Sequence, residues 1–231
     1  MKTERSTEFP RWSRLIAAGL GMVVVSGCMT TRVEESKSAA TGIADDEAVV
    51  ILPTSYLAGS QTEDDFINCV SSTVTKGQQG INVHAKEEFV DALFPWFEPR
   101  TLPTETESLP ELLARPGVAE RIAERGIRYI VWVNGSTDRT DGGGSLSCAV
   151  GPGGGGCFGL AWWENDSSYE AAVWDLEDAS SVGTVSADVT GTSVIPAVVI
   201  PLPFIARTQT AACKGLSDQL QAFIVNEGPS A

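Results

Sequence analysis

The feature that most constrains this chain is a short apolar segment near its start. Arg11 and Arg14 precede an apolar run over residues 15–25, and two small residues then stand before Cys28. A basic leader, a short apolar stretch and small residues predict a secretory signal. The stretch is too short for a transmembrane helix, which needs roughly 20 mostly apolar residues. We therefore expect residues 1–27 to be removed on export, so that only the chain after them folds.

The charge of the remaining chain argues against some partners. Removing residues 1–27 takes away four basic and two acidic residues, which leaves 12 basic and 28 acidic residues and a formal net charge of −16. Binding of phosphate backbones and anionic headgroups normally depends on clustered lysine and arginine. We therefore expect no nucleic-acid partner. The negative charge favours solubility, with a basic partner as the alternative.

The residues Val25-Ser26-Gly27-Cys28 resemble the lipobox of bacterial lipoproteins. The resemblance implies cleavage before Cys28 and a lipid on the Cys28 sulfur. Met29 in place of aspartate after that cysteine is similar to lipoproteins sorted to the outer membrane. On this resemblance the protein is lipid-anchored at the outer membrane, faces the periplasm and contacts the membrane only through its lipid. The alternatives are an ordinary cleaved signal and an uncleaved anchor.

The other four cysteines predict two disulfide bonds. An even number of cysteines in an oxidising compartment favours pairing, and three pairings are possible. Cys148 and Cys157 lie close in sequence around a glycine-rich segment, which favours a local bridge and leaves Cys69 to pair with Cys213. Since the chain has one histidine and no Cys-x-x-Cys spacing, we expect no metal site.

The apolar pattern predicts one domain over residues 48–231, after a flexible, lipidated tether over residues 28–47. Apolar runs at 48–52 and 127–133 are typical of strands buried on both faces. Residues 160–163, 169–176 and 182–190 predict an antiparallel meander with polar turns at 165–168 and 177–180. Helical spacing of apolar residues after Thr62 and after Cys213 predicts helices that direct Cys69 and Cys213 inward.

Two segments have unusual composition. Residues 141–159 are very rich in glycine but lack a phosphate-binding motif, and we interpret them as a flexible hairpin tip tied by a disulfide. Residues 194–206 combine prolines with large apolar side chains. This segment is either a buried connection or edge strand, or an exposed flap that binds a partner through Ile200, Leu202 and Phe204.

The sequence contains no complete catalytic motif that we recognise. The Gly-x-Ser-x-Gly pentapeptide of α/β-hydrolases is absent. His84 is the one imidazole, and the acidic pairs Asp64 with Asp65 and Asp175 with Glu177 could serve glycoside hydrolysis only at a defined separation. We therefore expect no catalytic residues and no cofactor, with a cell-envelope hydrolase that uses carboxylates and His84 as the alternative.

The order of the expected elements resembles small periplasmic α/β lipoprotein domains. That group includes the curli-secretion-channel lipoproteins, the penicillin-binding-protein activators and the amino-terminal domain of the Tol-system propeller protein. The residues that carry the resemblance are the strand segments 49–53 and 127–133 and the stretch 172–185 with its aspartate and turn. The resemblance implies a single mixed, mostly antiparallel sheet flanked by helices.

The same resemblance implies a non-enzymatic accessory protein that binds a cell-envelope protein partner. A pore-forming subunit similar to the curli channel would require amphipathic membrane hairpins. Residues 141–163 are too rich in glycine and too poor in alternating apolar residues to predict such hairpins. We therefore expect an adaptor that uses the segment 194–206 as its contact surface.

Overall fold

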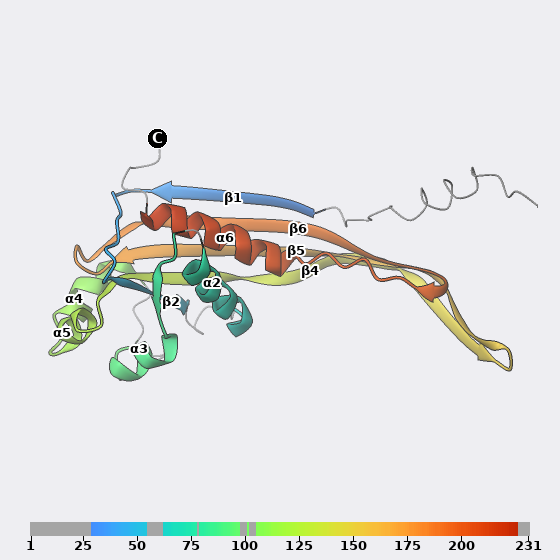
Figure 1. The fold of residues 1–231 in the computed structure, drawn as a ribbon, viewed down its shortest axis with the longest axis horizontal. Coiled ribbons are helices and arrows are strands. Elements are labelled where there is room, and N and C mark those ends of the chain that lie inside the picture. The colour runs from blue at the N-terminus through green and yellow to red at the C-terminus, as the bar shows by residue number, and fades with distance from the viewer. Residues whose placement is uncertain (1–28, 55–61, 78, 98–100, 102–104, 226–231) are drawn as a thin grey trace, which may run out of the picture.

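The computed structural model describes residues 29–54, 62–77, 79–97, 101 and 105–225. The described strands form a single six-stranded sheet in the order β1-β6-β5-β4-β2-β3 (Figure 1). Its strands are β1 (Met29–Lys37), β2 (Ala48–Pro53), β3 (Asn82–His84), β4 (Ile127–Gly151), β5 (Gly154–Asp175) and β6 (Ser180–Pro201). β2 runs parallel to β3 and β4, and the other neighbours are antiparallel. The predicted α/β fold, a mixed and mostly antiparallel sheet flanked by helices, is confirmed.

Two groups of helices cover opposite faces of the sheet. The helices α2 (Asp64–Lys76) and α6 (Thr208–Val225) bury apolar stripes against one face, in a cluster that includes Val131 and Val173. Three shorter helices, α3 (Lys86–Ala92), α4 (Leu109–Leu113) and α5 (Val118–Ala123), pack on the other face around Trp132 and Trp174. The single-turn 3-10 helix η2 (Thr106–Ser108) leads into α4. Alternate residues of the central strands therefore pack into two apolar cores, one on each face of the sheet, as expected for strands buried on both faces.

The prediction of a flexible tether over residues 28–47 is wrong for residues 29–37. Met29–Lys37 forms β1, which pairs antiparallel with β6 from Met29 opposite Gly191 to Lys37 opposite Gly183. The strand is mostly exposed and carries charged side chains, so it has no buried apolar pattern to reveal it in the sequence. Charged residues on an edge strand protect a sheet from adding further strands.

The expected turn at residues 165–168 is also wrong, and the glycine-rich segment is a pair of strands. β5 continues without interruption from Gly154 to Asp175, and β6 runs beside it through the proline-rich segment as far as Pro201. The long strands carry the sheet well past the helices as a narrow projection (Figure 1). In the described part of the chain, no helix is long and apolar enough to cross a membrane.

Candidate docking arm

The projecting end of the sheet is the most unusual surface of the molecule. We define the arm as residues 142–163 of the β4–β5 hairpin together with residues 194–205 of β6 and the chain that follows it. These segments contain no charged residue, although the whole chain has 46 of them. Along β4 the arm is exposed from Gly142 to Gly151. An exposed surface without charge does not contribute to solubility, so the arm is a candidate contact surface.

One face of the arm carries most of its large apolar side chains. Phe158, Leu160 and Trp162 of β5 lie directly opposite Val198, Pro196 and Val194 of β6. Directly opposed residues project on the same side of a sheet, so these six form one continuous surface, which we call the apolar face. Phe158 is 63% exposed, Leu160 50% and Val198 75%. On β4 the same face has small residues, since Ser145 and Ser147 lie opposite Leu160 and Phe158.

The opposite face of the arm has smaller residues at most positions. Gly159 and Ala161 of β5 lie opposite Ala197 and Ile195 of β6. Leu146 and Val150 of β4, exposed by 39% and 91%, project on this face with Val199 of β6. Gly144 and Gly159 hold positive φ angles of 94° and 139°, which a residue with a side chain rarely adopts, and an added Cβ would meet backbone oxygens at 2.0 and 2.1 Å. Glycine therefore allows the strands to twist and still pair.

The two long edges of the arm differ. On the β6 side, β1 covers the edge as far as Gly191, and the returning chain covers the next part through the bridge between Val194 and Phe204. On the other side, β2 pairs with β4 only as far as Val133. Beyond Val133, no described strand pairs with the outer edge of β4. This edge has no charged residue from Gly142 to Gly151.

The three residues predicted to bind a partner lie on this arm, in different settings. Ile200 and Leu202 are 67% and 56% exposed, whereas Phe204 is partly buried and hydrogen-bonds through its backbone to Val194. The proline-rich segment is thus an edge strand, one of the expected alternatives, and not a buried connection or a separate flap. It is the outer part of β6 together with the chain that turns back along its edge.

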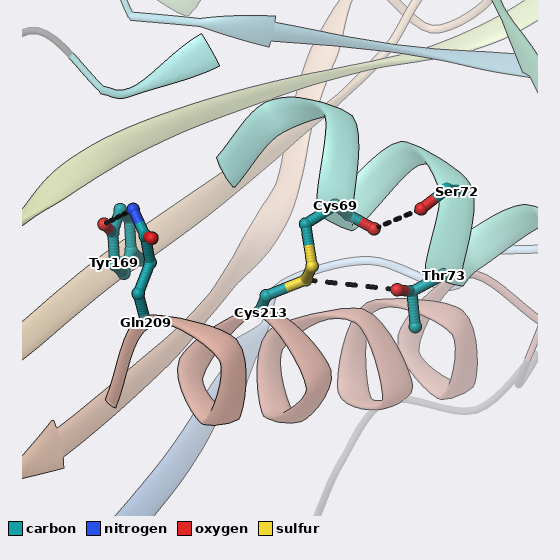
Figure 2. The surroundings of a disulfide bond; sticks show 6 residues. All are labelled: Cys69, Ser72, Thr73, Tyr169, Gln209 and Cys213. Carbon is teal, nitrogen blue, oxygen red and sulfur yellow. Dashed lines mark hydrogen bonds between the residues drawn. A yellow bond between two sulfur atoms is a disulfide. The ribbon is translucent and has the colours of Figure 1, made fainter. Parts of the chain in front are cut away.

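Both expected disulfide bonds are present. Cys148 and Cys157 lie opposite each other in the arm and are joined across β4 and β5. Cys69 and Cys213 join α2 to α6, with 6.3 Å between their Cα atoms, and the Cys213 Sγ lies 3.9 Å from the Thr73 hydroxyl (Figure 2). Cys28, the predicted lipidation site, lies outside the described residues.

The residues of the hydrolase alternative have separate contacts in the described structure. His84 makes a contact of 3.1 Å from Nδ1 to the Ala85 carbonyl, and no hydrogen bond or ion pair joins it to a described carboxylate. Asp175 is 1% exposed; its Oδ2 accepts from Arg128 at 2.7 Å, and its Oδ1 accepts from the backbone N–H groups of Glu177 and Asp178. Oδ1 of Asp175 therefore holds the β5–β6 turn, and Oδ2 joins Asp175 to Arg128 of β4.

The other acidic pair has a structural role as well. Asp64 and Asp65 lie in the first turn of α2, where the helix dipole favours negative charge, and Asp64 pairs with Lys86 at 2.9 Å. Among the described residues, no three His, Cys, Asp or Glu side chains are close enough to hold a metal ion.

A polar cluster at the start of α2 was not predicted from the sequence. The Tyr169 hydroxyl donates to Glu63 Oε2 at 2.8 Å and lies 2.9 Å from the Thr137 hydroxyl, while the Thr137 N–H donates to Glu63 Oε1 at 3.3 Å. Gln209 of α6 approaches the same hydroxyl at 3.5 Å (Figure 2). Burial raises the pKa of Tyr169 to about 12. The cluster joins α2, β4, β5 and α6, so its contacts fix the helices on the sheet.

Comparison with known proteins assigns no family. No family model matches the chain, and no curated protein matches it. Among solved structures, the chain is similar to the PelC dodecamer from Paraburkholderia phytofirmans, at 12% sequence identity and a TM-score of 0.36, over 86% of this chain and 99% of PelC. A single-residue variant of PelC matches at the same identity and TM-score, over 84% of this chain and 98% of the variant.

Proposed function

We propose that this protein is a lipid-anchored, non-catalytic adaptor of the bacterial cell envelope, which binds a protein partner through its arm. The observation that carries the proposal is the outer edge of β4 from Gly142 to Gly151. It is exposed, uncharged and without a strand partner among the described residues.

An edge of this kind is a ready template for another strand. Its unpaired N–H and C=O groups can bond to an extended segment of a partner, which gives affinity through the main chain. Proteins that remain monomeric usually protect such edges with charge, as the lysine, arginine and glutamates of β1 do here. The absence of that protection on β4, when the opposite edge of the same sheet has it, favours an edge that is covered by a partner.

The position of the edge also suits an adaptor. The arm projects beyond the helices, so a strand added to β4 would not meet α2 or α6 (Figure 1). The disulfide between Cys148 and Cys157 ties β4 to β5 near the tip. A cross-link limits the freedom that the hairpin would otherwise lose when it binds. The acidic residues of the globular body keep it soluble beside the partner.

The test is site-specific photocrosslinking in the native envelope. A photoreactive residue at the exposed position Ala149 should form an adduct with a second protein. Leu146→Lys with Val150→Lys places two charges on the edge strand and should reduce that adduct about tenfold, because charge disfavours strand addition. Thr30→Lys, on the exposed strand β1, is the matched control and should leave the adduct unchanged.

Three outcomes would contradict the proposal. They are no protein adduct at Ala149, an adduct unaffected by the two lysines, and adducts only between copies of this chain. Circular dichroism of each variant shows whether the fold is retained.

A further inference from the structure

We infer that the apolar face of the arm lies on the surface of a lipid bilayer, with its large side chains at the boundary between headgroups and acyl chains. This inference goes beyond the adaptor role, because it concerns a face of the arm and its lipid contact, whereas the adaptor role concerns an edge and a protein. It also adds a membrane contact to the one through lipid that the sequence predicted.

The composition of the face fits an acyl boundary. Phe158, Leu160 and Val198 are each at least half exposed, and Ile200, at the outer end of β6, is 67% exposed. At about 3.3 Å per residue, the uncharged part of β4 extends for about 30 Å. Apolar side chains that lie in the interface gain free energy in proportion to the area that they remove from water. The arm therefore offers a long surface to lipid with no charge to desolvate.

The end of the apolar face has the residues expected at a membrane boundary. Trp162 on the apolar face and Trp163 on the opposite face are partly buried where the arm joins the body, and tryptophan is enriched at headgroup level. Beyond them the same sheet carries Glu164, Asp166 and Asp188. The side chains thus change abruptly from apolar to acidic along the sheet. This change limits how far along the sheet the lipid contact can extend.

Met29, the residue after the predicted lipidation site, lies at the same level. Met29, directly after Cys28, pairs with Gly191 of β6, and Gly191 pairs with Asn165 of β5. Asn165 follows Glu164 and is two residues from Trp163. An acyl chain on Cys28 would therefore start beside the base of the arm, so the anchor and the apolar face can reach one bilayer without bending the body.

A surface position fits the arm better than a transmembrane one. In hydrocarbon the unpaired backbone groups of β4 would have no hydrogen-bond partner, and open sheet edges do not occur there. At headgroup depth water or a partner strand can satisfy them. The acidic body also favours a zwitterionic surface, because anionic headgroups would repel it.

The test uses the native, lipidated protein in phosphatidylcholine vesicles whose acyl chains carry bromine, a quencher of tryptophan fluorescence. Phe158→Trp places a reporter on the apolar face. Phe94→Trp is the matched control, since Phe94 is also 63% exposed but lies on the globular body. The signal is the fluorescence of each variant minus that of the parent, which has five tryptophans after residues 1–27 are removed.

We expect bromine near the headgroups to quench the reporter at position 158 at least about twofold more than the reporter at position 94. At position 158, bromine near the headgroups should also quench more strongly than bromine at the ends of the acyl chains. Adding Leu160→Asp and Ile200→Asp should remove most of that difference. Equal quenching at both positions would overturn the inference. Stronger quenching from the chain ends would overturn the surface position.

The two proposals fail separately. Leu146→Lys with Val150→Lys lies on the opposite face and should leave the quenching at position 158 in place while it removes the protein adduct. Quenching at position 158 without any protein adduct would leave the lipid contact standing and end the adaptor proposal. A protein adduct without quenching would do the reverse.

Discussion

Met29 lies opposite Gly191 in the register of β1 with β6, at the point where the body of the sheet passes into the arm. The pairing holds the chain next to Cys28 in place instead of leaving it on a flexible leash. A side chain on Gly191 would meet the Thr208 Cγ2 and Ala206 Cβ atoms at 2.7 and 2.8 Å, so β1, β6 and the start of α6 are closely packed here. Met29 and the base of the arm therefore belong to the same closely packed part of the sheet.

The first prediction concerns Cys28. Mass spectrometry of the native protein should find Cys28 as the first residue, with a diacylglycerol thioether on its sulfur. Cys28→Ser should prevent lipidation and release the protein from the membrane fraction, apart from the weaker binding through the arm. An unmodified thiol at Cys28 in native material would contradict the lipid anchor.

The second prediction concerns the disulfide between Cys69 and Cys213. Its partners are separated by 144 residues in sequence and join two helices of the main core. In the chain-entropy model a loop of that length stabilises the fold by about 5 kcal/mol. Replacing both cysteines by alanine should lower the free energy of unfolding by several kcal/mol in denaturant titrations. A loss below about 1 kcal/mol would show that the helices are held mainly by their apolar contacts.

The third prediction concerns the disulfide between Cys148 and Cys157, which closes a separation of only 9 residues in the exposed arm. The same model assigns a loop of that size about 3 kcal/mol. Because the arm lies outside both cores, we expect Cys148→Ser with Cys157→Ser to change the global free energy of unfolding by less than about 1 kcal/mol. Amide exchange in the arm should nevertheless become faster. A global loss near the model value would mean that the arm unfolds together with the body.

The fourth prediction concerns Tyr169, whose side chain is nearly inaccessible to solvent. Burial raises its pKa from 10.0 to about 12, so the folded state holds the hydroxyl proton more tightly than the unfolded state does. The stabilisation of the fold by the protonated Tyr169 hydroxyl is therefore complete below pH 10 and is lost as the pH rises towards 12. Between these pH values, the free energy of unfolding should fall more for the native protein than for Tyr169→Phe, by about 1–3 kcal/mol. Parallel curves for the two proteins would contradict this origin.

The sequence predicted the elements that bury apolar residues in a regular pattern. The strand over 127–133, the helix after Thr62 and the final helix are confirmed, because continuous or helically spaced apolar side chains must find a core. The inward positions of Cys69 and Cys213 followed from the same spacing. Sequence patterns of this kind report burial directly.

The arm and β1 could not be predicted in that way. Glycine has low strand propensity, so residues 142–156 resemble a loop unless their partners in β5 are known. Asn165, Asp166 and Ser167 favour turns, yet β4 and β6 pair with them on both sides and override that preference. β1 is polar and charged, and only its hydrogen bonds to β6 make it a strand. Long-range pairing decides all three segments.

The central claim is that the free edge of the arm is covered in the cell envelope. Amide hydrogen exchange along β4, compared between the purified protein and the protein in isolated envelopes, tests it most directly. The account predicts slower exchange in the envelope between Gly142 and Gly151, with no change in the exposed strand β1. Exchange rates along β4 that are the same in both preparations would contradict it.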